Sequence, residues 1–178
     1  MTATDGAGNI GSASVTYTAD NTAPVVTITA PAGGAYYKSS AVPGAAYSVV
    51  ELNPYTVVES GYSTSEGVQT CTVTATDGAG NVGSDSVAYT VDNTLPVVVI
   101  SAPAEGGYYQ TATLPPLDYT VTDNLDPNPI VEASGWSTDE GLHTVTVTAT
   151  DAAGNVGSGS VTYTVDNTPP TTDKDLSG

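Results

Sequence analysis

Residues 144–165 read TVTVTATDAAGNVGSGSVTYTV, a pattern that indicates the fold class. Valine, alanine and tyrosine alternate with threonine and other polar residues on both sides of the central DAAGN. Period-two alternation puts one face of a strand in a core and the other in solvent, which is typical of antiparallel sheets. The glycine between the two runs can take the positive φ that a tight hairpin needs. The stretch therefore predicts a β-hairpin.

The same pattern recurs along the chain. TDGAGN occurs at Thr4–Asn9 and Thr76–Asn81, and TDAAGN follows at Thr150–Asn155, so the equivalent aspartates are separated by 72 and then 74 residues. The tripeptide DNT recurs in step, and self-similarity at a fixed period indicates a repeat architecture. We divide the chain into residues 1–22, the C-terminal hairpin of an incomplete repeat; complete repeats at 23–94 and 95–168; and 169–178, the start of a further repeat or a tail.

Each complete repeat has alternating patterns for five short strands. In the first repeat they are expected near 24–30, 45–50, 55–60, 68–76 and 84–91, with equivalents in the second. Several short strands at this spacing favour a compact β-sandwich. The residues expected in the core are Cys71, Val73, Val87, Tyr89, Val145, Val161 and Tyr163.

The run TVTATDAAGNVGSGSVTYTVDNTPP at 146–170 resembles the end of a prokaryotic immunoglobulin-like repeat of surface proteins and adhesins. YTVTDNLDPNP at 119–129 is similar to the second strand and following loop of such domains. The resemblance implies an all-β fold of tandem immunoglobulin-like antiparallel β-sandwiches in an extended array. It also implies an extracellular or cell-surface location. Because these repeats occur in adhesins, S-layer-type proteins and extracellular enzymes alike, the fold alone does not set the function.

The composition excludes several classes of function. Nineteen acidic residues stand against two basic ones, Lys38 and Lys174, which gives a formal charge of −17. Nucleic-acid binding needs Lys and Arg to neutralise phosphates, so no nucleic-acid partner is expected. The longest aliphatic run, Val97–Ile100, is too short for membrane insertion. One Cys and one His permit neither a disulfide framework nor a Cys/His zinc site.

We also predict that the chain is not an enzyme. Glu132, Asp139 and Glu140 could in principle form a carboxylate pair for hydrolysis. However, Glu132 is replaced by Val58 in the other repeat, so the pair is not a shared feature of the repeats.

Three oxygen-rich segments, the linker and two loops of the second repeat, are expected to meet at the 94/95 junction. In an immunoglobulin-like sandwich, the loop after the second strand and the turn between the last two strands lie at the end where the linker enters. These segments offer the side chains of Asp92, Asn93, Asp123, Asp126, Asp151 and Asn155. Calcium takes roughly six to eight oxygen ligands, so the sequence predicts a calcium site there. The DNTxP linker also resembles the calcium-binding linker of cadherins.

The first repeat offers a similar set at the 22/23 junction. It consists of Asp20, Asn21, Glu51, Asn53, Asp77 and Asn81. Its loop is shorter and has fewer carboxylates, so a weaker calcium site is expected. The alternative for both sets is that these Asp and Asn residues only form turns, because their side chains readily cap nearby backbone groups.

Three functions remain open on the sequence. The favoured one is a structural, calcium-stabilised spacer, stalk or fibre segment of a large extracellular protein, with neighbouring repeats of the same protein as partners. The second is a self-assembling filament subunit joined by strand complementation, a homopolymer motivated by the uncovered Val15 and Tyr17 in the incomplete repeat. The third is a ligand- or glycan-binding adhesin module, for which the repeated candidates are Tyr36, Tyr37, Tyr108 and Tyr109.

Overall fold

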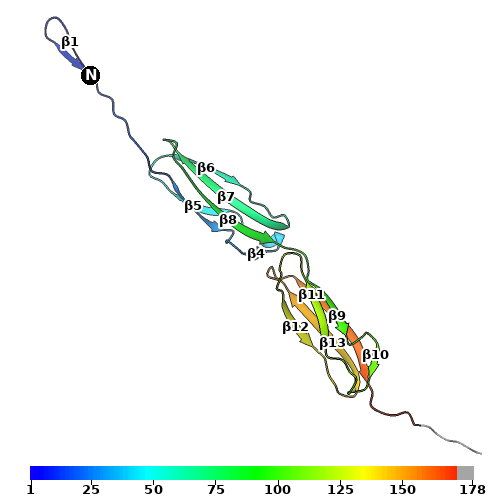
Figure 1. The fold of residues 1–178 in the computed structure, drawn as a ribbon. Coiled ribbons are helices and arrows are strands. Elements are labelled where there is room, and N and C mark those ends of the chain that lie inside the picture. The colour runs from blue at the N-terminus through cyan, green and yellow to red at the C-terminus, as the bar shows by residue number, and fades with distance from the viewer. Residues whose placement is uncertain (172–178) are drawn as a thin grey trace, which may run out of the picture.

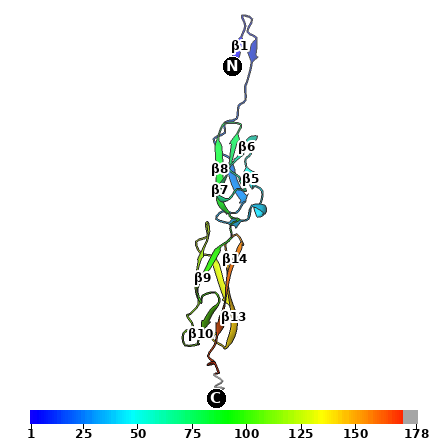
Figure 2. The same cartoon turned by 90° about the vertical axis from the view of Figure 1, so that its right-hand side faces the viewer.

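A computed structural model describes residues 1–171. Two β-sandwiches lie end to end along an elongated molecule, and a short hairpin at the N-terminal end extends beyond them (Figure 1). The view from the side shows the same extended arrangement (Figure 2). The all-β fold of tandem sandwiches that the sequence predicts is confirmed. Within the described residues no helix is long or apolar enough to cross a membrane.

Each sandwich has one four-stranded and one two-stranded layer. In the first sandwich the larger layer has the order β4 (Tyr36–Tyr37), β8 (Val82–Val91), β7 (Gly67–Asp77) and β6 (Tyr55–Ser60). Its smaller layer pairs β3 (Val25–Ala30) with β5 (Ala46–Val50).

The second sandwich repeats this topology. Its larger layer has the order β10 (Gly107–Tyr109), β14 (Val156–Val165), β13 (Gly141–Thr150) and β12 (Ile130–Ser134). Its smaller layer pairs β9 (Val97–Ala102) with β11 (Asp118–Thr122). The five strands expected in each repeat therefore form, with ends shifted by at most two residues in the first.

The strands β4 and β10 are additions that the sequence did not predict. Each runs parallel to the last strand of its sandwich, with Tyr36 opposite Thr90 and Tyr108 opposite Thr164. All other pairings are antiparallel. A strand of two or three residues is too short for alternation to reveal it, which is why the pattern pointed to antiparallel pairing alone.

The core lies between the two layers of each sandwich. Cys71, Val73, Tyr89, Val145 and Tyr163 are buried as expected. Val87 and Val161 were also expected to be buried. They are only half-buried, although they pack against the core clusters. A two-stranded layer is narrower than the four-stranded layer that it faces, so it leaves part of that layer uncovered.

The buried tyrosines keep their hydroxyl groups paired, which a polar group in a core requires. The Tyr89 hydroxyl accepts from the Ser63 backbone N–H at 2.9 Å and donates to the Ser63 carbonyl at 2.7 Å. Tyr163 forms the equivalent pair with Ser137. Each tyrosine thereby fastens the segment that leads into the long central strand to the core.

The ends of the described chain carry less structure. Strand β1 (Thr2–Thr4) pairs with β2 (Ile10–Ser12), and Ala13 to Pro24 form no strand. Val15 and Tyr17, which were expected in a hairpin face, are 85% and 87% exposed. Pro169 to Thr171 form no strand, and the rest of the segment expected to start a further repeat lies outside the described residues.

The start of each sandwich passes very close to its last strand. A Cβ added to Gly83 would lie 1.8 Å from the Pro24 carbonyl oxygen, and the equivalent Gly157 is equally close to the Pro96 oxygen. Real Cβ atoms do not approach backbone this closely, so only glycine fits at these positions.

We therefore predict that Gly83→Ala lowers the stability of the first sandwich by about 1–3 kcal/mol, the usual effect of overpacking. The control is Gly44→Ala, because a Cβ there meets nothing within 4 Å and the backbone does not have a positive φ. Urea unfolding of the two variants measures the difference. Equal stability of both would contradict the close approach.

Candidate metal centre

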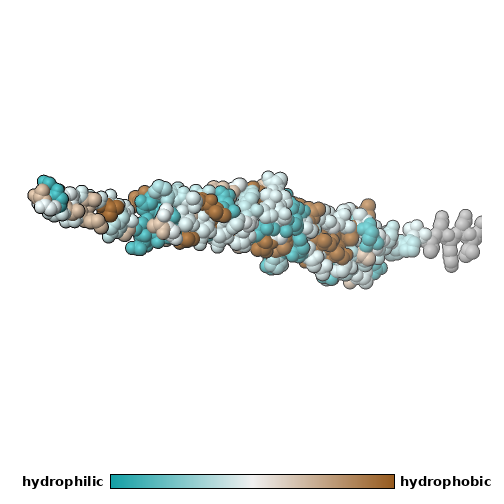
Figure 3. All heavy atoms as spheres, turned by 90° about the horizontal axis from the view of Figure 1, so that it is seen from above, coloured by the Kyte–Doolittle hydropathy of each residue, from teal (hydrophilic) through white to brown (hydrophobic). Residues whose placement is uncertain are grey.

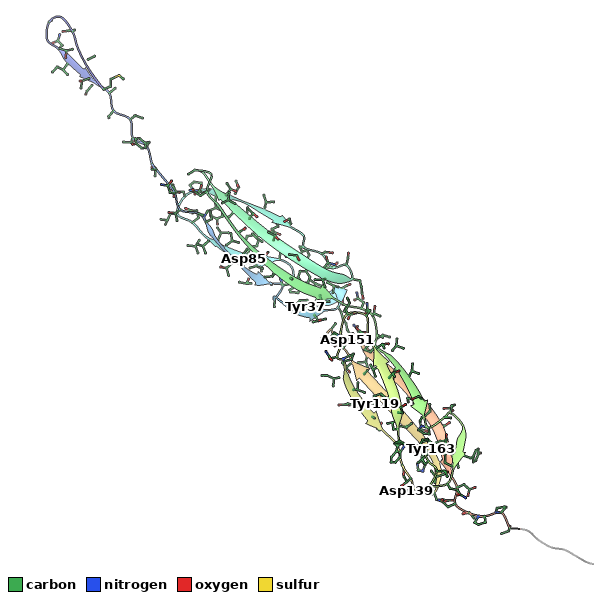
Figure 4. All side chains as sticks on the ribbon, in the orientation of Figure 1. Tyr37, Asp85, Tyr119, Asp139, Asp151 and Tyr163 are labelled. Carbon is green, nitrogen blue, oxygen red and sulfur yellow. The ribbon has the colours of Figure 1, made fainter. Side chains whose placement is uncertain are left out.

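The turn between β13 and β14 fixes Asp151 at the junction of the two sandwiches. Asp151 Oδ1 accepts from the Asn155 backbone N–H at 2.7 Å, and Asp151 Oδ2 accepts from the Asn155 side-chain amide at 2.7 Å. Gly154 has a φ of 82°, which closes the turn without steric cost. Asp151 lies where the two sandwiches meet (Figure 4).

The linker supplies Asp92, which is bound to both sandwiches through its backbone. Its N–H donates to the Tyr37 carbonyl of the first sandwich at 2.8 Å. Its carbonyl accepts from the Asn155 amide of the second at 3.0 Å. Its Oδ1 accepts from the Thr94 backbone N–H at 3.0 Å. The whole residue is 0% exposed, so this carboxylate is held in a defined, dry position.

The loop after β11 supplies Asp123. Its Oδ1 accepts from the backbone N–H groups of Leu125 at 3.0 Å and Asp126 at 2.8 Å. These two bonds shape the loop and fix the orientation of the carboxylate. The other oxygen, Oδ2, is left for contacts outside the loop.

Asp92, Asp123 and Asp151 form what we call the junction cluster: one oxygen from each lies within 4.8 Å of the others. Asp92 Oδ2 and Asp123 Oδ2 are both buried and have no hydrogen-bond partner. They are the two such side-chain atoms among residues 1–171. Oxygens that share one calcium ion at about 2.3–2.6 Å lie within about 5 Å of one another, so the spacing fits this cation.

Charge repulsion makes the junction cluster unfavourable by itself. Burial raises the pKa of Asp92, and the negative charges of Asp123 and Asp151 act in the same direction, against the hydrogen bond from Thr94. Since the raised pKa means that the folded state disfavours ionised Asp92, its charge destabilises the fold at neutral pH. A cation in the cluster would remove this penalty.

Three other side chains predicted for this site have different contacts. Asp126 accepts from Asn128 and Ala152 backbone N–H groups, both at 2.9 Å, and so braces the loop against the β13–β14 turn. Asn93 faces the first sandwich, where its Oδ1 accepts from the Ser39 N–H at 2.9 Å. Asn155 uses its amide to hold Asp92 and Asp151 in place.

A second acidic group, the proximal cluster, consists of Asp20, Glu51 and Asp77. Here the Asn53 side-chain amide donates to Asp20 Oδ2 at 2.6 Å, and the Asn81 amide donates to the Asp20 carbonyl at 3.1 Å. The hydrogen bond from Asn81 also lowers the pKa of Asp77.

The Asn53 amide thus supplies positive partial charge where the junction cluster has bare oxygens. Asn21, also predicted as a ligand, is exposed. A weaker calcium site was expected at the 22/23 junction. The Asn53 amide gives a physical reason for that expectation, because it already occupies an oxygen of Asp20.

The sequence reasoning missed Glu66, which lies in the segment just before β7. Its carboxylate accepts from the Asn93 amide at 2.9 Å, the Thr94 hydroxyl at 2.9 Å and the Asn124 amide at 3.3 Å. These donors lower the pKa of Glu66 to about 2. The signal was present in the repeats, because STSEG at 63–67 and STDEG at 137–141 place a glutamate at the same point.

The paired tyrosines do not form a common exposed platform. Tyr37 packs edge-on against Tyr89, with ring centroids 6.2 Å apart, and Tyr109 packs likewise against Tyr163. Tyr108 is 78% exposed. On the face shown in Figure 3, apolar residues form small separate patches among hydrophilic ones.

Comparison with known proteins finds distant likenesses. No family model matches the sequence, and no curated protein is similar enough to count as a relative. The fibronectin(III)-like modules of Clostridium thermocellum CbhA are 18% identical to this chain. The match covers 79% of this chain and 94% of the CbhA chain, with a TM-score of 0.40. Drosophila N-cadherin EC1-4 is 13% identical to this chain. The match covers 82% of this chain and 50% of the cadherin chain, with a TM-score of 0.30.

The uncompensated oxygens of the junction cluster lead to a prediction for metal-free protein. Asp92→Asn keeps an oxygen for the Thr94 N–H and turns an amide toward the cluster, as Asn53 does in the proximal cluster. In the presence of chelator this variant should have a higher melting temperature than the wild type. The expected gain in stability is about 1–3 kcal/mol, the usual effect of giving a buried polar group a hydrogen-bond partner.

The matched control is Asp20→Asn, whose Oδ2 position already faces the Asn53 amide. It should not stabilise the protein. A fall in melting temperature for Asp92→Asn under chelation would show that the cluster carries no charge penalty.

Proposed function

We propose that this chain is a structural spacer segment of a large extracellular protein, and that a calcium ion bound at the junction cluster stiffens its two sandwiches into a rod. The observation that carries the proposal is the pair of buried, unpartnered oxygens, Asp92 Oδ2 and Asp123 Oδ2. Buried polar atoms in proteins nearly always have a partner, and exceptions call for an explanation such as an ion.

The donor chemistry favours calcium over other common metals. The grouped ligands are carboxylate oxygens, with neither a thiolate nor an imidazole among them, and zinc prefers sulfur and nitrogen. The three carboxylates come from a linker, a loop and a turn, and such a site suits the flexible coordination of calcium better than the strict octahedron of magnesium. When bound, calcium would supply two positive charges against three carboxylates.

The position of the cluster is what connects binding to stiffness. Asp92 belongs to the linker, whereas Asp123 and Asp151 belong to the second sandwich. An ion held by all three ties the linker to the sandwich that follows it. Small sandwiches without disulfides have small cores, so this contribution matters. At a free calcium concentration ten times the Kd, binding adds about 1.4 kcal/mol to stability.

The proposal predicts a calcium response that depends on the junction cluster. Chelation should lower the melting temperature of the wild-type chain and broaden the distribution of angles between the sandwiches in solution scattering. Asp123→Asn keeps the oxygen that accepts from Leu125 and Asp126 but removes the charge, so it should lose most of the response.

Glu51→Gln provides the matched control, because Glu51 occupies the equivalent loop position in the proximal cluster. It should retain most of the wild-type response in calorimetry and melting. If titration of the wild-type chain with millimolar calcium gives no binding heat, the clusters are turns only and the calcium proposal is wrong.

A further inference from the structure

Glu66 holds the linker from the side of the first sandwich. Its Oε2 accepts from the Asn93 backbone N–H at 3.0 Å and from the Asn93 amide at 2.9 Å. Its Oε1 accepts from the Thr94 hydroxyl at 2.9 Å. These contacts hold the two residues that follow Asp92, so they restrict the direction in which the linker leaves the first sandwich.

The same carboxylate also reaches the second sandwich. The Asn124 amide donates to Glu66 Oε1 and to the Thr94 hydroxyl oxygen, both at 3.3 Å. Asn124 directly follows Asp123, whose carboxylate shapes the turn that presents it. A second contact supports this arrangement, because the Tyr36 hydroxyl donates to the Leu125 carbonyl at 3.5 Å. One loop therefore carries both a cluster carboxylate and the contacts that cross the junction.

The chain provides an internal comparison. Glu140 makes the corresponding contacts at the far end of the second sandwich, accepting from the Asn167 N–H at 3.0 Å and the Asn167 amide at 2.9 Å. It also accepts from the Thr168 hydroxyl at 3.3 Å. Among the described residues, no counterpart of Asn124 contacts Glu140. The glutamate therefore clamps its own linker in both sandwiches, and at Glu66 it gains a link to the next sandwich.

We propose that Glu66, Thr94 and Asn124 form a latch that docks the second sandwich on the first and positions the carboxylates of the junction cluster for a cation. Glu66 is thus a positioning residue rather than a ligand. The latch is built from hydrogen bonds alone and so acts without metal. Its role in cation binding rests on the proposed function, whereas its role in docking does not.

The test compares Glu66→Gln with Glu140→Gln in the full chain. Both variants weaken a linker clamp within one sandwich, so a loss of stability that they share is local. In chelator, Glu66→Gln should broaden the angular distribution in solution scattering relative to Glu140→Gln. With calcium alone as the probe, calorimetry should show about tenfold weaker binding for Glu66→Gln, the lower end of the effect of removing supporting contacts. Glu140→Gln should bind calcium as the wild type does.

Asn124→Ala provides a second variant that leaves the linker clamp intact, because Asn124 is exposed and contacts Glu66 only through its side chain. It should reproduce the broadened scattering of Glu66→Gln. If the two glutamate variants scatter alike in chelator, the latch does not dock the sandwiches. If scattering differs but the calcium affinity does not, the positioning role is wrong. An absence of calcium binding to the wild type would overturn the proposed function and the positioning role, and leave the docking result standing.

Discussion

Asp92 is the residue at which the two sandwiches meet. Its N–H donates to Tyr37 in one sandwich and its carbonyl accepts from Asn155 in the other, so the peptide units around it cannot turn freely. The buried carboxylate is thereby placed within 4.8 Å of oxygens of Asp123 and Asp151. The acidic cluster is a consequence of this backbone constraint. A negative charge is thereby placed on a buried residue beside two further carboxylates.

The repeat and the alternation were enough to predict the fold class and most of the strands. The resemblance to immunoglobulin-like sandwiches also indicated that the turn at Asp151 and the loop at Asp123 lie at the same end of the sandwich, where the structure brings these two residues together. Sequence spacing could not show which way each side chain points. Asp92 and Asn93 are adjacent, yet one faces the cluster and the other faces Ser39, because consecutive residues of an extended segment point to opposite sides.

The two clusters show that a small sequence difference changes the partners of an acidic group. Both contain three acids from equivalent segments. In one, the Asn53 amide donates to the linker aspartate; in the other, the loop is longer and Asp126 turns toward Ala152 instead. The distinction depends on where a single amide lies, which composition cannot reveal. Composition likewise gives no indication that Glu66 binds the linker through Asn93 and Thr94.

The short parallel strands β4 and β10 have a mechanical consequence. Because β4 runs parallel to β8, tension along the rod pulls the two strands in opposite directions along their length. The bonds from Thr90 N–H to the Ala35 carbonyl and from Asp92 N–H to the Tyr37 carbonyl are then loaded in shear, side by side. Bonds loaded in this way share the force and break together, whereas those of a hairpin pulled apart at its open end break one by one. The last bond of this patch belongs to Asp92, so the contact that resists sliding of β4 along β8 also anchors the linker residue of the junction cluster.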